Sequence, residues 1–161
     1  MFNGIKINHI VAVNNLGYIG KDNKLLCEDP ADLKHFKEVT NNGIIVMGKN
    51  TWESLPKKPL PNRQSFVLSK SSEQSEIFYN DLFELLDDAT KIAKLKNLNE
   101  IWIIGGESIY SQTSFLADDI YISVIDDNSS GDTKYCNDLL NNKKCTNIKK
   151  ISTKTKLFIY T

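Results

Sequence analysis

The sequence predicts one α/β domain with a mostly parallel central sheet, an antiparallel edge near the C-terminus and flanking helices. Short β-rich apolar runs alternate with helical patterns along the 161 residues, and this alternation is typical of α/β folds. Several runs are apolar on consecutive residues, as strands covered by helices on both faces are. No repeat or Pro/Gly/Ser-rich linker interrupts the chain, so we expect residues 1–161 to form a single domain.

The predicted elements follow one another in a regular order. Five apolar runs are expected to form buried strands: residues 10–13, 44–47, 65–68, 101–104 and 120–125. Between the third and the fourth run, residues 82–95 repeat apolar side chains at helical spacing, with Asp81 as the expected N-cap. The tail, residues 148–160, has the pattern of two strands around a polar turn, which predicts the antiparallel edge.

Composition and charge exclude several classes of protein. Hydrophobic residues make up 40% and charged residues 25% of the chain, and the formal net charge is zero. Neither a nucleic acid nor a membrane is therefore an expected partner. Cys27, Cys136 and Cys145 form no CxxC pair, which argues against a disulfide framework or a metal site and favours a reducing compartment. With no signal-peptide pattern at the N-terminus and no obvious apolar seam, a cytoplasmic monomer is expected.

An acidic residue occupies the apolar side of one predicted helix. Residues 29–40 begin with Asp29 in an N-cap position and Pro30 in the first helical position. On a helical wheel, one arc of this segment is formed by Leu33, Phe36, Val39 and Thr40. Asp32 falls within this arc, and two interpretations of it are open.

The first interpretation of Asp32 is structural. It is then the third-position partner of Asp29 in a capping box, or an acid that suits the helix dipole. The second interpretation is functional, because a carboxylate buried without a partner is costly. Its place among apolar residues then indicates a cleft that receives paired N–H donors, such as the amidine edge of a heterocycle.

Two predicted strands end in glycine turns suited to phosphate groups. Gly48 follows residues 44–47, Gly105-Gly106 follows residues 101–104, and each turn precedes a helical pattern. Glycine permits close backbone approach, and a helix start offers free N–H groups. Neither turn is the GxGxxG fingerprint, so a Rossmann fold is not supported. Either turn alone is ordinary, but together they predict a nucleotide or dinucleotide cleft at the carboxyl ends of the strands.

Taken together, these motifs resemble those of the dihydrofolate reductase family over nearly all of residues 7–160. The matching stretches are Ile10-Val11-Ala12-Val13, Tyr18-Ile19-Gly20, Pro30-Ala31-Asp32-Leu33, Val46-Met47-Gly48-Lys49, Thr51-Trp52-Glu53-Ser54, Pro59-Leu60-Pro61 with Arg63, Ile103-Ile104-Gly105-Gly106 and Gly131-Asp132-Thr133. The resemblance implies NADPH-dependent reduction of 7,8-dihydrofolate to tetrahydrofolate, by hydride transfer to C6 with protonation at N5. It also implies antifolate inhibitors as ligands.

By this resemblance, residues of several segments assemble the substrate site. They are Ile10, Asp32, Leu33, Phe36, Leu55, Lys58, Arg63, Ile104 and Ser123, and those implied to be catalytic are Asp32, Ser123, Leu25 and Tyr110. Asp32 would hold the 2-amino group and N3–H of the pteridine, with the Ser123 hydroxyl bonded to its carboxylate. Arg63 would hold the α-carboxylate of the glutamate tail through its bidentate fork. The alternative for Arg63 is a solvated loop charge.

The resemblance also assigns the NADPH site. The nicotinamide side would comprise Ala12, Ile19 and Gly20, the adenosine-phosphate side Leu68, Ser69 and Lys70, and the phosphate turns Gly48, Lys49, Asn50, Thr51, Ile104, Gly105, Gly106, Glu107, Ser108, Ile109 and Tyr110. The Gly105-Gly106 peptide bond is expected to be cis by the same resemblance. Lys49 and Lys70 favour NADPH over NADH, and Asn50, where the family often has a basic residue, makes that preference modest.

Residues 14–29 are expected to form a loop that opens and closes over the cofactor, with water beside it as the proton source for N5. Within this loop, Leu26 and Cys27 depart from the Pro and Trp that the family commonly has. A cysteine fills far less space than an indole. Either neighbouring residues fill the difference, or the pocket is roomier and the loop more mobile.

Two other functions stay open on sequence alone. One is the reduction of a pyrimidine intermediate in flavin synthesis, by a related reductase that shares this fold. The other is a non-catalytic binding module that keeps the fold. Asp32 on its helix and Arg63 after Pro59-Leu60-Pro61 argue against the first. The absorbance of NADPH, followed with dihydrofolate present, distinguishes all three.

Overall fold

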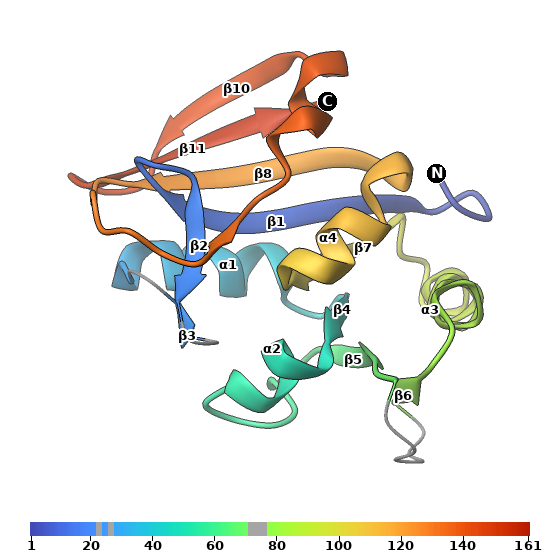
Figure 1. The fold of residues 1–161 in the computed structure, drawn as a ribbon. Helices are drawn as coiled ribbons and strands as arrows, with labels where there is room; N and C mark the ends of the chain where they lie inside the picture. Colours follow the sequence, from blue (N-terminus) through green and yellow to red (C-terminus); the bar gives the residue numbers. More distant parts are fainter. Residues whose placement is uncertain (22–23, 26–27, 71–76) are drawn as a thin grey trace.

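Eight of the described strands join into one large sheet, and three others form a second, smaller sheet (Figure 1). The computed structural model describes residues 1–21, 24–25, 28–70 and 77–161. Five strands account for the five predicted runs: β1 (Lys6–Asn14), β4 (Ile44–Gly48), β5 (Gln64–Leu68), β7 (Glu100–Gly105) and β8 (Ala117–Ile125). The sheet is completed by β6 (Phe78–Tyr79), β10 (Cys145–Lys150) and β11 (Thr155–Tyr160).

The order of the strands is β10-β11-β8-β1-β7-β4-β5-β6. All neighbours from β8 to β6 are parallel, whereas β11 runs antiparallel to both β8 and β10. The mostly parallel sheet and its antiparallel edge at the C-terminal hairpin are therefore confirmed. In Figure 1 this hairpin lies at the opposite edge of the sheet from β5 and β6.

Helices pack against the two faces of the sheet. They are α1 (Pro30–Thr40), α2 (Lys49–Ser54), α3 (Leu82–Leu95) and α4 (Glu107–Gln112), with short 3-10 turns at η1 (Ser114–Leu116) and η2 (Asn137–Asn142). Alternate strand residues divide between two apolar cores, as the period of a strand requires. Ile44 and Val46 join the core of α3 and α4, while Ile45 and Met47 join that of α1 and α2. The predicted cap of α3 is confirmed, since Asp81 accepts a hydrogen bond from the Glu84 backbone N–H at 3.0 Å.

Strand β1 begins before the predicted apolar run 10–13 and includes two buried polar residues, Asn8 and His9. The Asn8 amide donates to Glu100 at 2.8 Å. The two ring nitrogens of His9 lie 2.8 Å from the Tyr135 hydroxyl and 2.7 Å from the Thr113 hydroxyl. Buried polar groups are tolerated when they are paired in this way, and these partners lie too far along the chain for a local pattern to reveal.

The segment expected to be a loop, residues 14–29, contains regular structure, and this corrects the expectation. Strand β2 (Tyr18–Lys21) pairs antiparallel with β3 (Lys24–Leu25) and with β9 (Thr133–Lys134). The side-chain oxygen of Asn14 accepts hydrogen bonds from the backbone N–H groups of Leu16 and Tyr18, both at 3.0 Å. These bonds turn the chain after β1, so that β2 continues beside β9.

Leu26 and Cys27 lie outside the described residues, and the alternatives stated for them stay predictions. The side chain of Leu25 also lies outside them, although its backbone pairs with Gly20. Within the described ranges, no helix has the length and apolar character needed to cross a membrane.

The buried His9 makes stability depend on pH. Burial, and secondarily Lys143, lower the pKa of His9 from 6.5 to about 3. The pKa of His9 is lower in the folded than in the unfolded state. The contribution of neutral His9 to the free energy of unfolding is therefore fully present above pH 6.5 and is lost as the pH falls toward 3. We expect the free energy of unfolding to fall by up to about 1.4 kcal/mol per pH unit in this window. Urea unfolding at several pH values measures this slope, and an equal slope in His9→Gln would contradict the assignment.

Candidate active site

Strands β1 and β7 separate at their carboxyl ends. They pair as far as His9 and Ile103, after which β1 continues beside β8 and β7 beside β4. The connections also leave in opposite directions, since α1 leads from β1 to β4 and α4 leads from β7 to β8. Open α/β sheets bind ligands at such a switch point. The candidate site is therefore at this end of the sheet.

Asp32 is buried in the first turn of α1. Its relative exposure is 7%, and it faces Ser123 of β8, which pairs with Ala12 of β1. Burial raises the pKa of Asp32, whereas the Ser123 hydroxyl and the His35 ring act to lower it. Among the described residues, no basic side chain forms an ion pair with this carboxylate. The site therefore favours a ligand that donates hydrogen bonds to Asp32.

The cap of α1 is Asp29 rather than an Asp29–Asp32 box. The Asp29 carboxylate accepts a hydrogen bond from the Ala31 backbone N–H at 3.1 Å. In the described part of the chain, Asp32 makes no bond back to the backbone of Asp29. The same Asp29 carboxylate also binds Ser152 and Thr155. Sequence analysis missed these two partners, because no local spacing links residue 29 to the C-terminal hairpin.

Several of the residues expected on the substrate side lie together. Ile10, Phe36, Leu55 and Ile104 belong to one apolar cluster, which is built on Trp102 and other buried residues of the sheet. Their proximity arises because the α1 and α2 segments pack on the same face of the sheet.

Leu33 differs from the helical-wheel expectation, since it is 45% exposed. Leu33 lies at the edge of the apolar arc. Asp32 and Phe36 face the sheet, and Leu33 does not. Lys58 is exposed as well. The structure therefore brings neither residue into the apolar cluster.

Arg63 is partly buried and makes hydrogen bonds with two neighbouring residues. Its Nε donates to the Pro61 carbonyl at 2.9 Å, and its Nη1 donates to the Thr40 hydroxyl at 3.2 Å. The guanidinium also lies 6.0 Å from the centre of the Phe36 ring. Because a guanidinium has five N–H donors, these contacts orient Arg63 and leave donors for a carboxylate.

The two glycine turns face each other at the ends of β4 and β7. A Cβ atom on Gly105 would lie 3.3 Å from the Thr51 hydroxyl, and one on Gly106 would lie 3.5 Å from the same oxygen. Gly105 has a φ of +132°, which favours glycine, and the expected cis bond to Gly106 is confirmed. Gly48 and Gly106 are the N-caps of α2 and α4, and neither helix has a side-chain cap. The turns thus present backbone that no Cβ atom covers, which fits the phosphates of a dinucleotide.

The other residues expected at the cofactor vary in burial. Ser69, Ile109 and Tyr110 are buried, Ala12, Ile19, Gly20, Lys49 and Leu68 are partly exposed, and Asn50, Lys70, Glu107 and Ser108 are exposed. Lys49 lies 3.9 Å from Glu53, at the start of α2.

Tyr110 connects α4 to β1. Its hydroxyl donates to the Ile10 carbonyl at 2.6 Å, and its ring centre lies 5.1 Å from that of His9 and 5.2 Å from that of Tyr135. Burial raises the pKa of Tyr110, so its phenol is neutral at physiological pH. Its hydroxyl thus lies beside Gly105 and the middle of β1 at the same time.

The open end of the sheet has a buried acid on one side and paired glycine turns on the other. This arrangement defines an α/β enzyme that brings a small heterocycle against a nucleotide cofactor. A sequence model described as dihydrofolate reductase matches residues 6–157. The chain therefore belongs to the dihydrofolate reductase family, whose members are NADPH-dependent oxidoreductases.

Individual relatives agree with this assignment. The chain is 35% identical over 133 residues to the dihydrofolate reductase type 9 of Escherichia coli, covering 80% of this chain and 75% of the relative. It is 37% identical over 131 residues to the dihydrofolate reductase of Buchnera aphidicola subsp. Schizaphis graminum, covering 81% and 79%. It is 38% identical over 130 residues to the dihydrofolate reductase type 3 of Salmonella typhimurium, covering 80% and 77%.

Proposed function

We propose that this chain reduces 7,8-dihydrofolate to tetrahydrofolate with NADPH, and that Asp32 holds the pteridine ring. The observation that carries the proposal is the buried Asp32 carboxylate without a basic partner in the described structure. A pteridine offers this carboxylate two N–H donors side by side, from its 2-amino group and N3. Charge-assisted pairs of this kind are stronger than neutral hydrogen bonds.

The rest of the pteridine site follows from the surroundings of Asp32. Ser123 holds the carboxylate from β8. The backbone carbonyls of Ile10 and Ile104 are the proposed acceptors for the ring amino group. The Ile10 carbonyl already accepts the Tyr110 hydroxyl, and a carbonyl oxygen has a second lone pair for the substrate.

The glutamate tail of the substrate is assigned to Arg63. Its contacts with Pro61 and Thr40 hold the guanidinium beside Phe36. The aminobenzoyl ring would then lie between Phe36 and Leu55, which share one apolar cluster. Leu33 and Lys58, at the exposed rim, are proposed to contact the substrate only on its solvent side.

NADPH supplies the hydride for this reaction. The glycine turns at Gly48 and Gly105-Gly106, with Thr51 between them, are the proposed phosphate site. Ala12, Ile19 and Gly20 are proposed to surround the nicotinamide, and Ser69 and Lys70 the adenosine phosphate. These residues lie at the ends of β1, β2, β4, β5 and β7 or just beyond them.

The contribution of this chain to the chemistry is positioning and a local negative charge. Asp32 orients the pteridine, so that C6 is presented at the open end of β1 and β7. Its charge also stabilises a proton at N5, which water delivers. We propose that Tyr110, Ser123 and Leu25 position the reactants and transfer no proton themselves. The Tyr110 hydroxyl, for example, already donates to the Ile10 carbonyl.

The proposal is tested by the rate at which NADPH is oxidised with dihydrofolate and with the pyrimidine intermediate of flavin synthesis. Turnover is expected with dihydrofolate and not with the pyrimidine. Turnover with the pyrimidine would favour the related reductase, and binding without turnover would favour a non-catalytic module. A cytoplasmic monomer is part of the proposal, and sedimentation at assay concentrations tests the monomer.

Replacing Asp32 by asparagine is expected to preserve the fold and to lower kcat/KM about 100-fold or more at neutral pH. The amide cannot carry the negative charge that favours the protonated substrate. Activity should partly recover at lower pH, where more substrate is already protonated. Steady-state assays across pH measure this. A variant as active as the parent at neutral pH would contradict the role of Asp32, and an unfolded variant would favour a structural one.

Arg63→Ala is expected to weaken dihydrofolate binding by about 1.5–3 kcal/mol, the value of a charged bidentate hydrogen bond. NADPH affinity should stay within about twofold, because Arg63 lies on the α1 side of the site. Fluorescence titrations with each ligand measure the two effects. Equal losses for both ligands would show that Arg63 acts on the structure rather than on the substrate.

A modest preference for NADPH over NADH is expected, since Lys49 and Lys70 can pair with the charge of a 2′-phosphate, while Asn50, where the family often has a basic residue, carries no charge. The preference should fall in Lys70→Met and stay unchanged in Lys91→Met, where the lysine pairs with Asp87 on α3. The measurement is kcat/KM for both cofactors in the three proteins. Similar kcat/KM values for both cofactors in the parent would overturn the assignment of the basic residues.

A further inference from the structure

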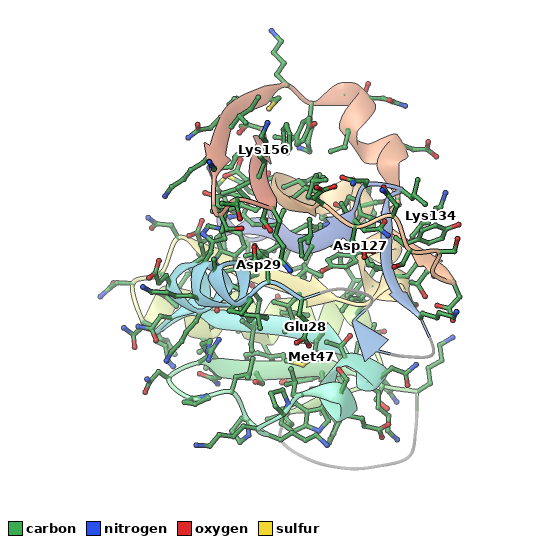
Figure 2. The ribbon with its side chains drawn as sticks, turned by 90° about the vertical axis from the view of Figure 1, so that its left-hand side faces the viewer. Glu28, Asp29, Met47, Asp127, Lys134 and Lys156 are labelled. Carbon is green, nitrogen blue, oxygen red and sulfur yellow. The ribbon has the colours of Figure 1, made fainter. Side chains whose placement is uncertain are left out.

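The Asp29 carboxylate is the centre of a contact between α1 and the C-terminal hairpin. It is 5% exposed and accepts hydrogen bonds from Ser152 Oγ at 2.5 Å and Thr155 Oγ1 at 2.6 Å, in addition to its bond with Ala31. The next turn residue, Lys154, donates from Nζ to the Glu28 carbonyl at 2.9 Å. In the view of Figure 2, Asp29 lies between α1 and the hairpin that carries Lys156.

This contact continues into the candidate active site. Asp29 is the N-cap of α1 and Asp32 lies in its first turn, close enough for the charge of Asp29 to act on the Asp32 carboxyl. Asp29 binds Thr155 at the start of β11, and Asp32 faces Ser123 on β8. The two strands are neighbours, with Leu157 of β11 paired to Ser123. The start of α1 is thus held to two adjacent strands, and in each case a carboxylate of the helix accepts a hydrogen bond from a hydroxyl of the strand.

A helix cap alone does not require this arrangement. Asp81 caps α3 by one bond to the Glu84 backbone, and in the described part of the chain its carboxylate accepts no hydrogen bond from a second element. Asp29 forms the same kind of cap and in addition binds two hydroxyls more than 120 residues away. Charge-assisted bonds to a carboxylate are strong and directional. They hold the helix start at one position relative to β8.

We propose that Asp29, Ser152 and Thr155 are positioning residues for the reductase reaction, which hold Asp32 in register with Ser123 and the pteridine. This inference rests on the proposed function of Asp32. It makes the C-terminal hairpin a part of the substrate site, although the hairpin carries none of the residues assigned to substrate or cofactor.

The charge of Asp29 adds an electrostatic effect to this positioning. Hydrogen bonds from Ser152 and Thr155 lower the pKa of Asp29, with Lys154 contributing, so Asp29 is ionised at neutral pH. Its charge raises the pKa of Asp32. The other groups acting on Asp32 are Ser123 from β8 and His35 from its own helix.

His35 is itself influenced by Glu38 and by Lys149 of β10, and burial lowers its pKa. It is therefore neutral above the ordinary histidine range. Removal of the Asp29 charge should lower the pKa of Asp32. Because the pKa of Asp32 is raised and that of His35 is lowered, the two groups approach each other, and the titration of each is followed by its own NMR signal.

Three variants and one matched control test the proposal. Asp29→Asn keeps a capping oxygen but removes the charge, whereas Ser152→Ala and Thr155→Val remove one hydroxyl each and keep the cap. Asp81→Asn is the control, because it alters the cap of α3 in the same way at a site remote from Asp32. The readouts are the free energy of unfolding, KM for each substrate, kcat as a function of pH, and the carboxyl ¹³C NMR titration of Asp32.

We expect Asp29→Asn to lower the pKa of Asp32, and the apparent pKa of the kcat profile, by roughly 0.5 pH unit. Thr155→Val and Ser152→Ala should each raise KM for dihydrofolate about fivefold, the effect of one lost hydrogen bond, with KM for NADPH unchanged. Thr155→Ser should restore KM. Asp81→Asn should reduce stability without moving either pKa or KM.

The proposal is overturned if the Asp29, Ser152 and Thr155 variants lose stability as Asp81→Asn does and leave KM and the titration of Asp32 unchanged. If Asp29→Asn fails to fold, the two hydroxyl variants decide through KM. A parent protein without reductase turnover would reject the proposed function instead. The NMR titration would still decide whether Asp29 acts on Asp32.

Discussion

The site depends on the burial of one carboxylate. Asp32 is 7% exposed, and no basic side chain among the described residues forms an ion pair with it. An ionised carboxylate in such surroundings is costly unless donors satisfy its oxygens. Ser123 faces it from β8, and a ligand with adjacent N–H groups can satisfy the rest. The proposed recognition of a pteridine by Asp32 rests on this buried carboxylate, whose oxygens the described side chains satisfy only in part.

The sheet opens beside this carboxylate, because β1 and β7 separate at their carboxyl ends. Beyond His9 and Ile103 the two strands follow different neighbours. The end of β1 lies on the side of Asp32, where the pteridine is proposed to bind, and the ends of β4 and β7 carry the glycine turns. Tyr110 bridges the two sides by donating to the Ile10 carbonyl. In the proposed function, substrate and cofactor bind to different parts of one sheet, as a hydride transfer between two bound molecules requires.

Local rules predicted much of this architecture. Consecutive apolar residues identify β4 and β7, the Asp29-Pro30 pair identifies the start of α1, and helical spacing places Asp32 on the buried side. Other features depend on distant partners and escaped these rules. His9 is tolerated inside β1 only because Tyr135 and Thr113 bind it, and β2 forms because β9 lies beside it. Leu33 follows the helical spacing and is exposed, because the spacing gives the side of the helix but not how far the sheet extends beneath it.

The central claim is that Asp32 is an ionised partner for paired N–H donors. The most direct measurement is the protonation state of a bound 2,4-diaminopyrimidine, followed by ¹⁵N NMR or ultraviolet difference spectra as a function of pH. Such a ring gains a second N–H donor for the carboxylate only when it is protonated. The account predicts that the bound ring stays protonated well above the pKa of the free compound, and that this stabilisation is lost in Asp32→Asn. A bound ring that titrates as it does in free solution would contradict the account.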